Sequence, residues 1–165
     1  MYQLRYWNQL KEFRTHVIYL HLYAVKSQHI ENTINITLAI ASSSSIAAWA
    51  IWKDFQFIWA AIIAISQVIS AIKPFLPYKQ RKKAVYELSS ALQAISLECE
   101  KGWHDVSEGI LTESEIHNKC FELRDKAMKA EKKCLNSLIL PPNDSLLHQS
   151  EVEADIYLKN NYNGG

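Results

Sequence analysis

Near the middle of the chain lie two uncharged stretches, TINITLAIASSSSIAAWAIW (residues 33–52) and FQFIWAAIIAISQVISAI (residues 55–72). Only Lys53 and Asp54 separate them. A helix needs about 20 mostly apolar residues to cross the hydrocarbon core of a bilayer, and both stretches are close to that length. We therefore predict an integral membrane protein with a tight two-helix transmembrane hairpin within residues 31–73. The alternative is a pair of buried core helices in a soluble domain.

The average composition hides this hairpin. Charged residues make up 21% of the 165 residues and the formal net charge is +1, as in many soluble domains. The charge is concentrated outside the two stretches, and aromatic rings cluster where the stretches meet. These rings, which prefer the headgroup layer of a bilayer, belong to Trp49, Trp52, Phe55, Phe57 and Trp59. The cluster predicts an interfacial belt around a short turn.

Basic residues flank the other ends of both stretches. Arg5, Lys11, Arg14 and Lys26 precede the first, and Lys73, Lys79, Arg81, Lys82 and Lys83 follow the second. The positive-inside rule then places both termini in the cytoplasm and the turn outside. The long, charged start of the chain argues against a signal peptide.

The remaining segments have helical periodicity, and no strand pattern competes with it, so we predict an all-α fold. Residues 1–30 form an amphipathic helix whose apolar seam repeats at steps of three and four residues. Residues 74–138 form a helical hairpin, in which Thr112 and Glu115 match a capping box that starts the second helix. Residues 139–165 are expected to be a loosely ordered tail with a short turn around Val152 to Leu158. The three seams belong to Tyr6, Leu10, Phe13, Val17, Leu20, Ala24 and Ser27; to Val85, Leu88, Leu92, Ile95, Cys99 and Val106; and to Ile116, Cys120, Leu123, Ala127, Ala130 and Cys134. Periodicity leaves open whether they pack within or between protomers.

Small and hydroxyl side chains inside the two stretches point to self-association, because they let helix backbones approach closely. Those predicted to share faces are Asn35, Ser42 and Ser45 on the first helix and Ser66 and Ser70 on the second. They are either packing residues of a passive anchor or the lining of a pore. Two helices cannot enclose a conduit, so a pore requires a homo-oligomer, with a tetramer as the expected form. With no charge at membrane depth, it would be weakly selective and gated by apolar rings.

The layout of residues 2–133 resembles the SLATT family of two-transmembrane effectors. The resemblance rests on the segments YLHLYAVKSQHIENTINITLAIASSSSIAAW, WKDFQFIW and KPFLPYKQRKKAVYELSSALQAI and on the helical hairpin that follows. The chain is similar to the short stand-alone members encoded beside a nucleotidyltransferase, as in the Hailong anti-phage system. This resemblance implies a bacterial inner-membrane channel that a nucleotide or oligonucleotide signal controls, and that permeabilises the membrane and arrests growth. Family members offer no active site to transfer.

A nucleotide signal would need cations for its phosphates and aromatic faces for its bases. The helix at residues 1–30 mixes both, so we predict that the signal binds there, on Tyr2, Arg5, Tyr6, Trp7, Lys11 and Arg14. The alternative is a helix that lies on the membrane or packs in the bundle. The basic cluster at residues 79–83 is more simply explained by topology and anionic lipid.

No enzyme signature is present: the chain has no glycine-rich phosphate loop, nucleophile elbow or zinc-protease motif. Cys99, His104, His117 and Cys120 could suggest a metal site, but both cysteines occupy apolar seam positions. We therefore expect no cofactor and no catalytic residue. The second functional hypothesis is a passive scaffold, whose hairpin anchors a helical adaptor that docks a partner protein.

Overall fold

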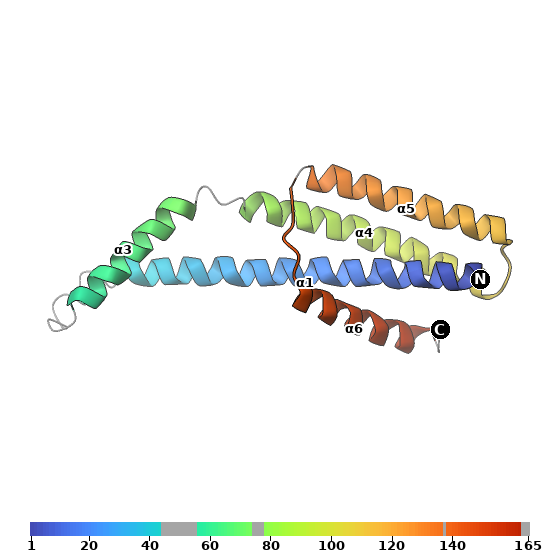
Figure 1. Cartoon of the computed structure of the whole chain (residues 1–165), viewed down its shortest axis with the longest axis horizontal. Helices are drawn as coiled ribbons and strands as arrows, with labels where there is room; N and C mark the ends of the chain where they lie inside the picture. Colours follow the sequence, from blue (N-terminus) through green and yellow to red (C-terminus); the bar gives the residue numbers. More distant parts are fainter. Residues whose placement is uncertain (44–55, 74–77, 137, 163–165) are drawn as a thin grey trace. The chain divides into compact units, whose positions relative to one another are not determined.

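The computed structural model describes residues 1–43, 56–73, 78–136 and 138–162, and every regular element in these ranges is a helix (Figure 1). The all-α prediction is thus confirmed. The helices are α1 (Tyr2–Ser43), α3 (Gln56–Ile72), α4 (Tyr78–Ser107), α5 (Glu113–Leu135) and α6 (Asp144–Asn161). Over the described residues, none of them combines the length and the apolar character that crossing a membrane requires.

The chain forms two compact units, which we describe separately. The first, here called the bundle, contains residues 1–25 and 80–165, and the second, here called the hairpin unit, contains residues 26–79. Helix α1 contributes to both, since it continues past the predicted end at residue 30 as far as Ser43. No Gly or Pro occurs between residues 1 and 73, so nothing in the sequence interrupts the helix there. The predicted turn at Lys53 and Asp54 lies outside the described residues.

Within the bundle, the three predicted seams meet in one hydrophobic core. Helices α1, α4 and α5 bury the apolar positions of all three seams against one another within a single chain. Leu10, Cys99 and Cys120 are fully buried at its centre. The seams are therefore satisfied inside one protomer. Burial of this kind contributes about 1.5–3 kcal/mol for each large side chain and is the main source of the bundle's stability.

The connection between α4 and α5 also follows the prediction. Gly109 adopts a positive φ of 69°, which favours glycine, and the chain then enters α5 through Thr112. The Thr112 hydroxyl accepts a hydrogen bond from the Glu115 backbone N–H, and the Glu115 carboxylate accepts one from the Thr112 backbone N–H at 2.8 Å. The capping box is thus confirmed.

The prediction of a loosely ordered tail is wrong. Residues 144–161 form the 18-residue helix α6, and the side chain of Asn143 caps it by accepting a hydrogen bond from the Leu146 N–H at 3.1 Å. Leu146, Ser150, Ala154 and Leu158 are its buried residues, one on each successive turn. Because two of these four are small or polar, the stripe carries little of the apolar signal that identifies a packed helix.

Candidate functional site

The hairpin unit carries the residues predicted to line a pore. Among the residues of this unit whose side chains the structure describes, none is buried. Its half-buried residues form two stripes, and the stripes are Ser27, Glu31, Ile34 and Leu38 on α1 and Ile63, Ser66 and Ile69 on α3. These steps of three and four residues are those of one helix face. The exposed large apolar side chains are Ile30, Ile36, Ile40, Phe57, Ile58, Ile62, Ile65, Val68 and Ile72.

The predicted pore-lining residues are placed unequally by the structure. Asn35 and Ser70 are exposed, and Ser66 is half-buried and donates a hydrogen bond to the Ile62 carbonyl of its own helix at 2.8 Å. Ser42 lies on α1 seven residues after Asn35, and its side chain is outside the described part, as is Ser45 altogether. Whether these five residues face a pore stays a prediction.

A residue that the sequence analysis assigned only to topology, Lys73, connects the two helices. Its Nζ donates a hydrogen bond to Oδ1 of Asn35. Lys73 is the residue directly after α3, three residues after Ser70 and seven after Ser66, so it continues the helix face on which these two serines lie. That spacing was visible in the sequence. The contact with Asn35 was not, because it requires the register of α1 against α3.

The predicted signal-binding residues lie in the bundle, where all six have partners. Tyr6 is a core residue with 1% of its surface exposed, and its hydroxyl donates to the Cys99 carbonyl at 3.0 Å. Burial is the main reason that the pKa of Tyr6 is raised well above its usual range. Its ring therefore has no open face on which a base could stack. In this conformation Tyr6 is a packing residue of the bundle core.

Tyr2 and Arg5 face helix α5. The Tyr2 ring meets the His117 ring edge-on, with 6.5 Å between the centroids. The Arg5 guanidinium lies 3.3 Å from Nδ1 of His117 and 5.7 Å from the centroid of the Phe121 ring. Because arginine can only donate, Nδ1 is the acceptor in this contact. Phe121 is 53% exposed, so this cluster is open to solvent on one side.

Trp7, Lys11 and Arg14 face helix α6 and part of α4. Lys11 pairs with Asp155 at 2.6 Å, and the Trp7 ring lies 6.1 Å from the ring of Tyr162. The Arg14 guanidinium stacks at 3.6 Å over the Tyr157 ring. Helix α6 thus covers half of the predicted signal-binding residues. These contacts could not be predicted from the sequence, because residues 139–165 were expected to be a loosely ordered tail.

Glu100 on α4 links these groups. It lies 3.8 Å from Arg14 and accepts hydrogen bonds from the hydroxyls of Tyr157 at 3.1 Å and Tyr162 at 3.3 Å. Burial, followed by the nearby Glu100 carboxylate, raises the pKa of Tyr162 to about 12. A protonated tyrosine is the form that can donate to the carboxylate, so the network is held together at neutral pH.

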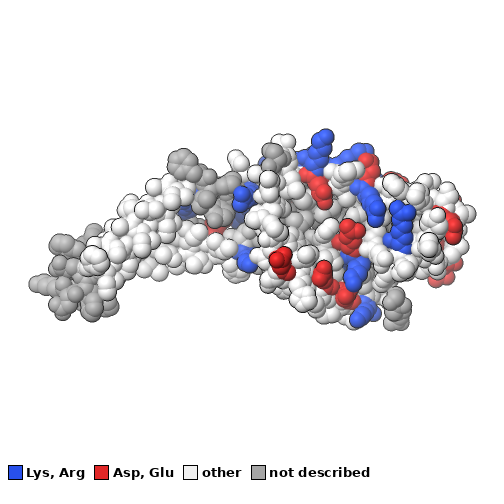
Figure 2. Space-filling model, viewed as in Figure 1, with Lys and Arg blue, Asp and Glu red and all other residues white. Residues whose placement is uncertain are grey.

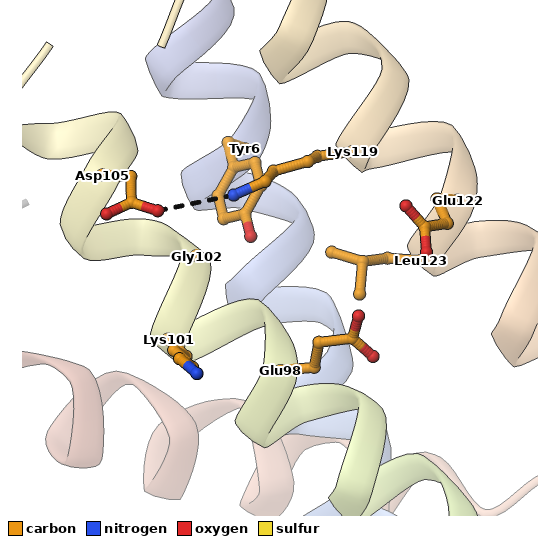
Figure 3. A pocket seen from close by; sticks show the side chains of 8 residues that line it. All are labelled: Tyr6, Glu98, Lys101, Gly102, Asp105, Lys119, Glu122 and Leu123. Carbon is orange, nitrogen blue, oxygen red and sulfur yellow. Dashed lines mark ion pairs between the residues drawn. The ribbon is translucent and has the colours of Figure 1, made fainter. Parts of the chain in front are cut away.

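A small pocket of about 240 Å³ opens between α4 and α5 (Figure 3). Tyr6 and Leu123 supply its apolar lining, and the rest of the rim is charged, with Lys119 paired to Asp105 at 3.5 Å. Gly102 is required here, because a Cβ at this position would lie 2.2 Å from the Tyr6 hydroxyl oxygen. The rim also contains Glu98, Lys101 and Glu122. The pocket is thus lined by charges of both signs, and one pair of them, Lys119 and Asp105, is joined across it.

The residues considered as a metal set do not converge. Cys99 and Cys120 are buried in the core as free thiols, and burial raises the pKa of Cys99 to about 12. His104 is exposed on α4, whereas His117 contacts Arg5. Within the described ranges, no three His, Cys, Asp or Glu side chains are grouped as metal ligands.

Comparisons with known protein families, with curated proteins and with solved structures gave no match for this chain. The functional argument therefore rests on the residues and contacts described above.

Proposed function

We propose that this chain is a homo-oligomeric membrane channel, an effector of a bacterial anti-phage defence system. In this proposal, residues 33–52 and 55–72 cross the inner membrane as a hairpin with both termini in the cytoplasm. Four copies are the expected number. A nucleotide or oligonucleotide from a nucleotidyltransferase encoded nearby controls the pore, whose opening permeabilises the membrane and arrests growth.

The observation that carries the proposal is the exposed apolar surface of the hairpin unit. Ile36 and Ile40 on α1 and Ile58, Ile65 and Val68 on α3 expose between 53% and 61% of their surface. A soluble monomer rarely exposes so many large apolar side chains together, and such a surface is typical of a membrane or protein contact. No ionisable residue interrupts either stretch in the sequence. Lipid and neighbouring copies are the surroundings that suit both features.

Signal control is the less direct part of the proposal. The cations Arg5, Lys11 and Arg14 remain partly exposed on the bundle, and each is already paired with an acid, a ring or His117. A phosphate-bearing signal would have to replace some of these contacts. Replacing all three cations with Gln should therefore remove signal control and leave membrane insertion intact. Unchanged control would move the signal site elsewhere.

Conductance across a planar bilayer that contains the purified full chain tests the channel directly, with nucleotides and short oligonucleotides added. Discrete current steps that one of them switches on or off are the expected result. A silent bilayer, with the protein inserted and oligomeric, would instead favour a membrane-anchored scaffold that docks a partner protein.

The pore face can be tested with a pair of variants on α3. Ser70→Leu places a bulky side chain on the predicted lining, and it should reduce the single-channel current at least severalfold. Ala61→Leu is the matched control. It lies nine residues earlier, on the opposite face at about 100° per residue, and Ala61 is also exposed. Equal currents in the two variants would show that Ser70 does not line the pore.

A further inference from the structure

We propose that Lys73 forms a ring of positive charge at the cytoplasmic mouth of the pore and gives the channel a preference for anions. This inference rests on the proposed channel function and adds ion selectivity to it. It replaces the expectation of a weakly selective pore, which followed from the absence of charge at membrane depth.

The first step is the position of Lys73 in the sequence. It is the first ionisable residue after the stretch of residues 55–72, so it stands where a second membrane helix would leave the bilayer. A lysine there has two possible environments: its ammonium can extend to lipid phosphates, or it can turn toward the pore axis. Position alone does not separate them.

The hydrogen bond of Lys73 favours the environment at the pore axis over the one at the lipid phosphates. Its Nζ donates to the side chain of Asn35, a residue predicted to line the pore. Directly after the end of α3, it continues the face that carries Ser66 and Ser70, the predicted lining residues of that helix. The ammonium is thus held where the polar faces of both helices come together. It remains exposed, so it can act on a passing ion.

The second step concerns how the two helices contact each other. The half-buried stripes of α1 and α3 mark this contact, with Ile34 and Leu38 on α1 and Ile63 and Ile69 on α3 as their large apolar members. Their polar members are Ser27, Glu31 and Ser66. Asn35, directly beside Ile34, and Ser70, directly beside Ile69, are exposed next to that stripe. Asn35, Ser70 and Lys73 are therefore exposed at the edge of the contact stripe, available to an aqueous pathway between copies, whereas Ser66 lies within the stripe.

The third step is electrostatic. In an oligomer each copy contributes one Lys73, and rings of lysine or arginine are the usual basis of anion selection in pores. The nearest acid on α1 is Glu31, four residues before Asn35 and about 6 Å along the helix axis, and it offsets part of this charge. Its side chain is half-buried, whereas that of Lys73 is exposed to the passing ion. The ring should therefore concentrate anions, most strongly at low salt, where the screening length exceeds about 10 Å.

Reversal potentials in a KCl gradient across the bilayer test this inference on the full-length channel. The wild-type chain should favour chloride over potassium, Lys73→Gln should lose most of that preference, and Lys73→Glu should change the sign of the reversal potential. Asn35→Asp keeps Lys73 but places a carboxylate beside it, so it should also weaken the preference for chloride. The preference should decline as the salt concentration rises.

The matched control is Lys26→Glu, which makes the same charge change on α1. Lys26 is exposed and lies nine residues before Asn35, about 13 Å along the helix axis, beyond the screening length of about 8 Å at physiological salt. It should leave the reversal potential unchanged. If Lys73→Glu and the wild type conduct with the same ion selectivity, the inference about Lys73 is wrong, but the channel proposal is unaffected. Lys73 would then be an anchor that faces lipid. If no variant conducts, the channel proposal itself fails, and the inference fails with it.

Discussion

The bundle and the hairpin unit are built from the same secondary structure but distribute their side chains in opposite ways. The bundle has a buried apolar core, with Tyr6 and Leu10 at 1% and 0% exposure, and carries charges of both signs outside (Figure 2), although some apolar residues such as Leu97 are exposed there. The hairpin unit exposes apolar side chains such as Ile65, and the two central stretches contain no charge. The two units therefore differ in how much of their apolar surface they bury.

Ion pairs join the helices of the bundle at its surface. Lys11 pairs with Asp155 between α1 and α6, and Lys126 pairs with Glu98 at 2.6 Å between α5 and α4. Each such exposed pair contributes only about 0–1 kcal/mol, so core packing and not charge holds the bundle together. The comparison between the units is thus a comparison of where apolar surface is buried, and single substitutions can test it.

The largest difference is expected between two truncations of apolar residues. Leu10→Ala removes a fully buried side chain from the bundle and should lower the free energy of unfolding by about 2–5 kcal/mol. Ile65→Ala removes a side chain that is 60% exposed, and should change that free energy by less than about 0.5 kcal/mol in mild detergent. Denaturant titration followed by circular dichroism measures both. Equal losses would mean that the hairpin unit has a core of its own.

A smaller difference should appear inside α6, where the tail was expected to be loose. Leu158 is 2% exposed and Ile156 is 54% exposed on the same helix. Leu158→Ala should cost about 2 kcal/mol, near the lower end for buried leucine because a peripheral helix can relax. Ile156→Ala should cost less than about 0.5 kcal/mol. Hydrogen exchange of the α6 amides, measured in the wild type and in both variants, would show whether α6 is docked. Amides that exchange as fast in the wild type as in Leu158→Ala would contradict the docking of α6.

Sequence patterns predicted the bundle well because its signal is local. The seams of α1, α4 and α5 repeat at steps of three and four residues. Each repeat identifies the buried face of its helix from that helix's own sequence, whatever the partner helix is. The Thr112 and Glu115 capping box is also a local signal, since it spans only four residues. Helix α6 was not predicted, because its buried stripe includes Ser150 and Ala154, which do not stand out as large apolar residues in a periodic pattern.

The candidate sites were predictable only in part, since they depend on contacts between helices. The cations and rings of residues 2–14 stand out in the sequence, and their role in signal binding stays a prediction. Composition could not reveal that Glu100 and Tyr157 already engage Arg14 or that Tyr162 packs on Trp7. Likewise, Lys73 is an ordinary flanking lysine in the sequence. Its link to Asn35 depends on how α1 and α3 are aligned, which no local pattern encodes.

The smallest expected effect is a pH dependence at the start of α5. Hydrogen bonds from the Thr112 backbone N–H and hydroxyl hold the pKa of Glu115 below its usual value of 4.5. A carboxyl group whose pKa is lowered by folding stabilises the protein above its unfolded pKa, and this contribution is lost as the pH falls through the lower, folded pKa. Glu115→Gln should therefore melt at a lower temperature than the wild type at neutral pH, and at the same temperature at about pH 2.

Thr112→Ala provides the reference for this comparison, because it removes the hydroxyl cap of the helix and should cost about 1 kcal/mol at neutral pH. Its cost should shrink at about pH 2 without vanishing, since the hydroxyl both caps the Glu115 N–H and donates to the Glu115 carboxylate. Thermal unfolding followed by circular dichroism between pH 2 and 7 measures all three proteins. Since the cap belongs to the bundle, the same scans also report whether acid unfolds the bundle before the hairpin unit. A gap in melting temperature between the wild type and Glu115→Gln that stays constant across this range would show that the ionisation of Glu115 contributes nothing to stability.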